Sequence, residues 1–209
     1  MMSISRNGAK VAASLIAVLL AAQATWAAPA KVDGKLAEGI RLHDAAREDP
    51  SNIDKAKAIL GSLKDGSPLA LGYYGSVVTL EANVASDNKK MLEALALLKE
   101  GTGYIDQAIK QSPELSDLRF IRLETGYEIS VSSPMNRFKE MKTDIDWLTA
   151  RTSQLDVSER GVLELYRGLY LAKAKKIDEA LDAFDKCVEV SPGSPEAAEA
   201  KKQIARYAE

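Results

Sequence analysis

Apolar side chains recur at helical spacing along most of the chain after its first 30 residues. In the most regular stretch, residues 167–192, Ala180, Phe184 and Cys187 are separated by four and three positions and so share one face of a helix. Lysines at 175–176 end the helix before it. The pattern predicts a helical hairpin in which Ala180 marks a close crossing and Phe184 fills the space between hairpins.

The same spacing recurs when positions are counted back from three prolines that each follow a serine. The three sets are Ala180, Phe184 and Cys187 before Pro192, Ala56, Leu60 and Leu63 before Pro68, and Gly101, Ile105 and Ala108 before Pro113. Pro113 and Pro192 are far enough apart in the chain to hold a further unit between them. The residues that supply its second helix are Phe138, Met141, Ile145 and Leu148. The chain is therefore expected to repeat.

These patterns predict one all-helical domain over residues 28–209, with about nine helices and no sheet. The first hairpin is expected from about residue 34 to 63, with Ser51 capping its second helix. The second has a helix over 69–85 and a turn over 86–90, and Gly101 and Gly103 in its long second helix mark a kink or a close backbone approach. The third begins after Pro113 with Glu114 in its first turn.

The remaining segments complete this expected order. Residues 152–158 are expected to be a polar linker before the last hairpin. A final helix that begins at Ser194 and Pro195 is expected to cover the open end of the repeats, which would otherwise expose apolar surface.

The order Gly168, Ala180, Phe184, Cys187 and Pro192 resembles the tetratricopeptide repeat, whose pattern W-x2-L-G-x2-Y, then A-x3-F, then P covers about 34 residues. The chain departs from the pattern in the first helix, where Glu164 and Arg167 replace Trp and Leu. The resemblance implies an all-α, right-handed solenoid of about four hairpins plus a C-terminal capping helix. It also implies that the first helix of each hairpin lines a concave groove.

Residues 69–75 and 119–148 are also similar to exported bacterial tetratricopeptide proteins of unassigned role. This similarity implies a fold and a location in the cell envelope, and it implies no activity.

Residues 1–27 have the layout of a secretory signal peptide. A short basic start precedes an uncharged apolar run at 11–24, and small residues precede Ala28, with cleavage after Ala30 as the second choice. We expect a periplasmic or secreted protein with no membrane span after cleavage, and an uncleaved anchor is the alternative. Loss of Arg6 and Lys10 changes the net charge from −2 to 26 − 30 = −4, which does not favour nucleic acid as a partner.

The chain has one cysteine, Cys187, and one histidine, His43. An internal disulfide is therefore impossible, and metal sites of His and Cys or Ser–His and Cys–His nucleophile pairs are not expected. Cys187 is expected to be buried and His43 to lie on a solvated helix face. The carboxylate pairs Asp144 with Asp146 and Glu159 with Glu164 are expected to be solvated. No catalytic residue, cofactor or metal is predicted.

The sequence instead favours a non-enzymatic interaction module of the bacterial envelope that binds a peptide or protein partner in its groove. Aromatic and arginine side chains dominate such contacts. The candidates are Tyr73, Tyr74, Arg119, Arg122, Arg137 and Tyr166. We expect the three arginines to form a cationic patch for a carboxylate of the partner, unless they are paired with Glu124 or Glu128. The alternative function is binding of a small ligand or cell-wall fragment in a pocket near the second and third hairpins.

Overall fold

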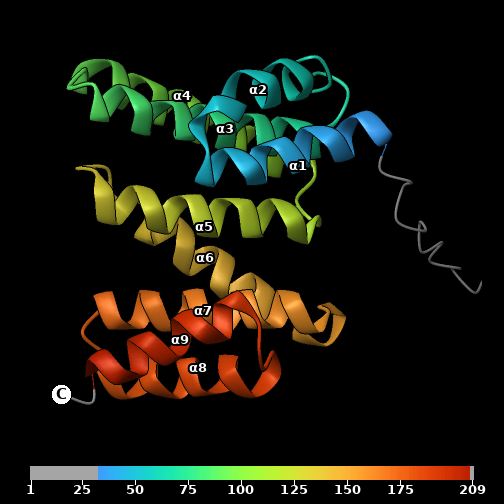
Figure 1. Cartoon of the computed structure of the whole chain (residues 1–209). Helices are drawn as coiled ribbons and strands as arrows, with labels where there is room; N and C mark the ends of the chain where they lie inside the picture. The colour runs from blue at the N-terminus through green and yellow to red at the C-terminus, as the bar shows by residue number, and fades with distance from the viewer. Residues whose placement is uncertain (1–32, 208–209) are drawn as a thin grey trace, which may run out of the picture. The chain divides into compact units, whose positions relative to one another are not determined.

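The computed structural model describes residues 33–207, and the predicted signal peptide at 1–27 lies outside this range. The described residues form nine α-helices and two short 3-10 helices with no strand, which confirms the all-α prediction (Figure 1). The elements are α1 (Gly34–Glu48), η1 (Pro50–Asn52), α2 (Ile53–Gly61), α3 (Pro68–Asp87), α4 (Met91–Gln111), α5 (Ser116–Ser132), α6 (Phe138–Thr149), η2 (Thr152–Gln154), α7 (Val157–Lys173), α8 (Ile177–Val190) and α9 (Pro195–Tyr207).

Consecutive helices pack as pairs, α1 with α2, α3 with α4, α5 with α6 and α7 with α8. The first helices also contact one another, because α3 packs on both α1 and α5, and α5 packs on α7. Helix α9 packs on α8 and α7, as expected for a helix that covers the end of the last pair. Figure 1 shows this order from α1 and α2 to α8 and α9.

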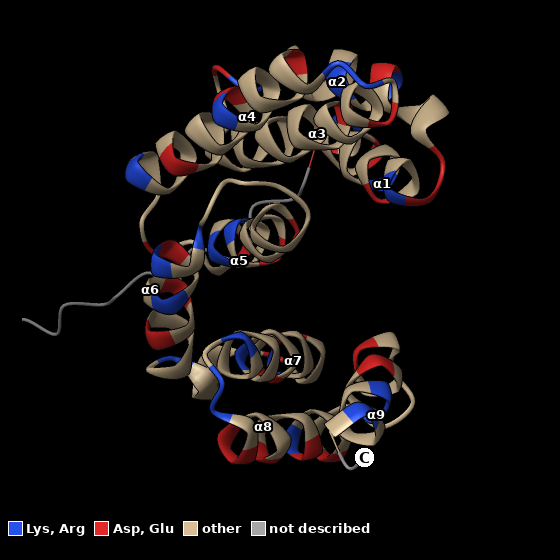
Figure 2. Cartoon of the chain, turned by 90° about the vertical axis from the view of Figure 1, so that its left-hand side faces the viewer, with Lys and Arg blue, Asp and Glu red and all other residues tan. Residues whose placement is uncertain are grey.

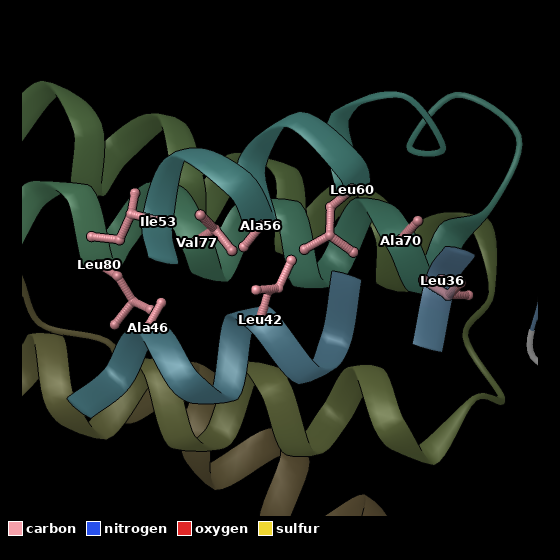
Figure 3. Packing of buried hydrophobic residues seen from close by; sticks show 9 residues of the cluster. All are labelled: Leu36, Leu42, Ala46, Ile53, Ala56, Leu60, Ala70, Val77 and Leu80. Atoms are coloured by element: carbon pink, nitrogen blue, oxygen red, sulfur yellow. The ribbon is translucent and has the colours of Figure 1, made fainter. Parts of the chain in front are cut away.

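The first hydrophobic core joins α1, α2 and α3 (Figure 3). Ala56 and Leu60, which the repeat spacing placed on the packed face, are fully buried in it, and Leu63 packs partly buried against it. Pro68 begins α3, and the Ser67 hydroxyl accepts a hydrogen bond from the Ala70 N–H group at 3.2 Å. The predicted packed face of α2 is thus confirmed.

The last pair, α7 and α8, packs as the sequence predicts. Ala180, Phe184 and Cys187 are completely buried, and the Phe184 ring lies where a side chain at Gly168 would be. The Cys187 thiol donates a hydrogen bond to the Gly161 carbonyl at 3.3 Å, and burial raises its pKa. The turn before α8 places Lys175 in the left-handed region, with φ of 61°.

Helices α3 and α4 approach each other most closely at Gly75 and Gly101. A Cβ atom on either residue would lie 2.5 Å from the other's carbonyl oxygen. Gly101 therefore marks a close backbone approach, whereas a Cβ on Gly103 would meet nothing within 4 Å. No other residue type fits at Gly75 or Gly101 without separating the two helices.

Three local predictions need correction. Ser51 does not cap α2: the Asp49 carboxylate accepts from the Ser51 N–H and hydroxyl groups and caps the 3-10 helix η1, and α2 follows with Asn52 at its N-cap and no side-chain cap hydrogen bond. Glu114 precedes α5, whose first turn contains Asp117 instead. The expected linker at 152–158 contains η2 and the start of α7, where Asp156 and Glu159 form a reciprocal capping box.

Within the described range, every helix is too short or too polar to cross a membrane.

Candidate functional site

The first helices line two adjoining hollows, of about 230 and 350 Å³. Asp44, Arg47, Glu124 and Val162 line both, so the two hollows adjoin, and together they are called the groove. The helices that carry these residues are α1, α5 and α7, which Figure 2 shows one below the other. In that view α9 lies at the lower right, and α6 lies to the left of α5, on the side opposite α1. The remaining lining residues are His43, Tyr73, Ser76, Asp117, Phe120, Ile121, Thr125, Ser158 and Glu159 in the first hollow and Leu165, Tyr166, Pro195 and Glu196 in the second.

His43 lines the first hollow and is buried, so the prediction of a solvated histidine is wrong. Its Nδ1 atom lies 2.8 Å from Asp44 Oδ1, and its Nε2 atom lies 2.9 Å from the Ser76 hydroxyl. Ser76 in turn lies 3.3 Å from the Thr125 hydroxyl. The ring of Tyr73 packs edge-on against the imidazole at 5.1 Å. Both ring nitrogens are therefore satisfied inside the fold.

A Ser–His pair thus exists, contrary to the expectation from the histidine count. Ser76 lies in the middle of α3, where the backbone N–H groups are engaged in helical hydrogen bonds. A hydrolase would need free donors near this hydroxyl to stabilise an oxyanion. The hydrogen-bonded chain of Asp44, His43, Ser76 and Thr125 joins α1, α3 and α5.

Arg47 crosses the groove from α1 to α5. Its guanidinium binds Glu124 at 3.2 Å and also binds Glu128. Burial alone would lower the pKa of Arg47, but the charges of Glu128 and Glu124 outweigh it and raise the pKa. The Tyr166 hydroxyl lies nearby on α7, and burial raises its pKa. Arg47 therefore keeps its charge and links two first helices.

Glu124 is the most perturbed carboxyl group of the groove. Burial raises its pKa to about 7, the charge of Arg47 opposes this rise, and the carboxylates of Glu128, Glu196 and Asp44 add to it. A group with this pKa changes its charge within the neutral range. The charge that Glu124 contributes to the groove therefore depends on pH near neutrality.

The groove carries an excess of carboxylates. Among the described lining residues, the carboxylates are Asp44, Asp117, Glu124, Glu159 and Glu196. Arg47 is the arginine in the same set, and the set contains no lysine. The groove is therefore acidic, opposite in sign to the patch expected from the sequence.

The candidate tyrosines separate into two groups. Tyr73 lines the first hollow and Tyr166 the second, as the sequence suggested for groove residues. Tyr74 lies on the other side of α3, where its ring packs edge-on against Tyr104 of α4 at 5.2 Å and beneath the Lys64 ammonium. Tyr74 is accordingly part of the contact between first and second helices.

The candidate arginines lie together on the side of α5 away from the groove, Arg119 and Arg122 on α5 itself and Arg137 directly before α6. Arg119 and Arg122 bind Asp144 of α6 at 3.1 and 2.7 Å, and Arg122 and Arg137 bind Asp106 of α4 at 3.0 and 2.8 Å. The Arg119 guanidinium also packs on the Trp147 ring at 5.0 Å. We call this set the arginine network. Its side chains are at most 13% exposed for the arginines and 0% for Asp144.

The expected cationic patch is therefore wrong, because two carboxylates of the same chain occupy it. Asp144 is also not solvated as predicted, since it is enclosed between α5 and α6 with its charge matched by Arg119 and Arg122. Glu164 is buried as well and is paired with Arg167 and Lys186. Both acids are structural ion-pair partners.

The sequence did contain a signal for the groove. Asp117, Glu124 and Glu128 are separated by seven and four positions and so share a face of α5 opposite Arg119 and Arg122. Tyr73 and Ser76 are three positions apart on α3 and so also share a helix face. These two faces, taken together, would have identified part of the groove. The role of His43 and Arg47 depends on how α1 meets α3 and α5, which local spacing does not give.

The described residues contain no group of His, Cys, Asp and Glu side chains arranged to hold a metal ion. Comparisons with family models, with curated proteins and with solved structures gave no match.

Proposed function

We propose that this chain is a non-enzymatic interaction module with a tetratricopeptide-like solenoid fold, which holds a segment of a peptide or protein partner in the groove. The observation that carries the proposal is the pair of adjoining hollows that residues of α1, α3, α5 and α7 line. An extended segment needs such a track, and residues from several helices can then contact successive side chains.

The charge of the groove favours a cationic segment. Five carboxylates line it against the single guanidinium of Arg47, and opposite charge raises both the rate and the selectivity of association. Tyr73 and Tyr166 add aromatic surface of the kind that dominates binding energy at interfaces. The partner chemistry is thus a peptide that carries lysine or arginine, in place of the carboxylate expected from the sequence.

The alternative, a small-ligand or cell-wall-fragment site near the second and third hairpins, has less support. A hollow of about 480 Å³ does lie there between the α3–α4 end and the end of α5. It is lined mainly by small and apolar residues, and no tyrosine or arginine is among its described lining residues. Convergent polar and aromatic groups, which fix the orientation of a small ligand, are found in the groove instead.

Export to the envelope is part of the proposal and rests on residues 1–27. Mass spectrometry of the protein from its native cells checks it. The expected N-terminus is Ala28, and an intact Met1 or Met2 contradicts export by this route.

Binding is tested with a randomised 12-residue peptide library displayed on phage and selected on the purified protein. We expect the selected peptides to be enriched in lysine and arginine. Their affinity is then measured for a groove variant in which Asp44→Asn, Asp117→Asn and Glu124→Gln are combined. A matched control combines Asp146→Asn, Asp178→Asn and Glu179→Gln, which removes the same charge from α6 and α8.

We expect the groove variant to lose tenfold or more in affinity and the control less than twofold. Circular dichroism confirms that both variants are folded. Failure to select any peptide, or equal affinity for both variants, overturns the proposed site.

A further inference from the structure

We propose that the first hollow of the groove is a subsite for an alkylammonium group, such as a lysine side chain. This inference rests on the proposed function and adds to it the chemical group that the hollow selects. An alkylammonium group has an apolar stem and a charged end with three hydrogen-bond donors. The first hollow offers a matching surface for each part.

The stem is matched by the apolar and aromatic walls. Phe120 and Ile121 of α5 and Val162 of α7 line one side, and Tyr73 of α3 lines another. A tyrosine face attracts a cation within about 6 Å of its centre, and its edge and ring carbons contact methylene groups. These walls come from three helices, so the hollow is formed by the fold and not by one local segment.

The charged end is matched by acceptors on three different helices. Asp44 of α1, Asp117 of α5 and Glu159 of α7 line the hollow together with Ser76 and Thr125. Asp44 and Asp117 are exposed, and Asp117 accepts no hydrogen bond from residues 33–207. Its carboxylate is therefore free to accept one from a ligand.

The hollow is large enough for this group. The side chain of lysine beyond Cα has five heavy atoms, which at roughly 30 Å³ each, the liquid volume of a water molecule, need about 150 Å³. The hollow measures about 230 Å³. A side chain and one or two accompanying waters fill it.

Ammonium suits the hollow better than guanidinium. Arg47 already directs its two terminal nitrogens to Glu124 and Glu128. The remaining carboxylates of the first hollow come one from each of α1, α5 and α7. The rotatable donors of an ammonium group suit acceptors that are held on separate helices, and Asp117 offers both carboxylate oxygens to them.

His43 provides a direct readout, because it is the chain's single histidine and lines the hollow. The probes are 1,5-diaminopentane, a lysine-containing peptide from the library and the same peptide with N-acetyl-lysine. The uncharged control is 1-pentanol. The chemical shifts of the His43 ring protons are followed by NMR during titration of the untagged protein at low salt, where charge is least screened.

We expect saturable shifts of the His43 signals with the diamine and the lysine peptide, and a loss of affinity of fivefold or more on lysine acetylation or with 1-pentanol. Asp117→Asn is expected to weaken binding by fivefold or more. Its matched control is Asp178→Asn, since both residues are exposed aspartates at the second position of a helix. Thermal unfolding shows whether both variants are folded, and Asp44→Asn tests the α1 side in the same way.

The outcomes separate the two proposals. Binding of the peptide without the diamine identifies a lysine side chain as the source of the ammonium group. Binding of the diamine while no peptide binds supports the subsite and refutes the peptide-binding function. Peptide binding that is unchanged by acetylation refutes the subsite and leaves the function standing. Equal effects of Asp117→Asn and Asp178→Asn also overturn the subsite.

Discussion

Helix α5 carries arginine–carboxylate clusters on two opposite faces, and the two differ in almost every physical respect. On one face, the arginine network joins α5 to α4 and α6, with Asp144 fully enclosed. On the other, Arg47 binds Glu124 and Glu128 across the groove, with 32% of its side chain and 42% of that of Glu128 exposed. The same residue types thus serve a closed contact and an open one.

The difference lies in how the charges are matched. In the arginine network, each carboxylate accepts from two arginines, and the forked geometry of Arg122 uses both oxygens of Asp144. In the groove, carboxylates outnumber the cation and several reach solvent. The three arginines of the network face Asp144, Asp106 and, 3.8 Å from Arg137, Glu140, so the network leaves no net charge for a ligand, whereas the excess carboxylates of the groove attract a ligand of opposite sign. The location of arginines alone therefore does not locate a binding site.

The largest effect is expected from Asp144→Ala. This substitution leaves Arg119 and Arg122 in a buried site without their carboxylate, and breaking a buried pair in this way costs about 3–5 kcal/mol. Urea denaturation of the variant measures the loss in free energy of unfolding. Asp146→Asn, on the exposed side of the same helix, is the control and should stay within about 0.5 kcal/mol. Similar small effects for both would show that the network is open to water.

Asp106→Asn is expected to have the next largest effect, of about 1–3 kcal/mol, because it leaves donors of Arg122 and Arg137 unmatched. The amide can still accept, but its NH₂ group faces arginine donors. Asp185→Asn, exposed on α8, is the control. The midpoint of urea denaturation compares the two, and equal midpoints would exclude Asp106 from the stabilising network.

Glu124 gives the groove a pH dependence. Its pKa is raised from 4.5 to about 7 in the folded chain, so between these values the folded state binds more protons than the unfolded state. The contribution of this group to stability is therefore full below pH 4.5 and is lost as pH rises to about 7. Allowing for solvent contact, we expect a loss of about 1–2 kcal/mol.

Glu124→Gln should remove this part of the pH dependence. Denaturation midpoints between pH 5 and 8 measure it, and the wild-type chain should lose more stability than the variant over this range. Glu179→Gln, on α8, should follow the wild type. Parallel curves for all three proteins would rule out a raised pKa at Glu124.

Arg47→Met is expected to have the smallest effect on stability, about 0–1 kcal/mol, because the pair is partly exposed. Arg122→Met, which removes an arginine from the network on the other face of α5, is the matched variant and should cost several times more. Both are compared by urea denaturation at the same pH. A cost for Arg47→Met as large as that for Arg122→Met would remove the contrast between the two faces.

The fold was largely predictable because each packed face repeats a local spacing. Phe184, Met141 and Leu148 were assigned to packed faces from their neighbours in sequence, and all three are completely buried. The sequence predicted either a kink or a close backbone approach at Gly101, and the structure shows the close approach. Helix caps were less predictable, since Asp49 and Ser51 are both capable residues and only the path of the turn decides between them.

The site was only partly predictable, because it depends on which helix face meets which neighbour. Tyr73 and Tyr166 were identified from their place on first helices. Arg119 and Arg122 were assigned to the wrong face, because spacing shows that they lie together but not that Asp144 lies opposite. His43 was misjudged for the same reason, since Ser76 is 33 positions away in the chain.

The burial of Cys187 has a practical consequence for following the groove in solution. The chain has no other thiol, and this one is enclosed between α7 and α8 with its proton donated to the Gly161 carbonyl. Thiol-specific dyes react with the accessible thiolate, so they should leave the folded wild-type chain unlabelled. A cysteine introduced at an exposed position, such as Arg41 on α1 or Val157 on α7, would then carry the dye alone. Pairs of such positions on either side of α5 allow fluorescence energy transfer to report the width of the groove without first removing a native residue.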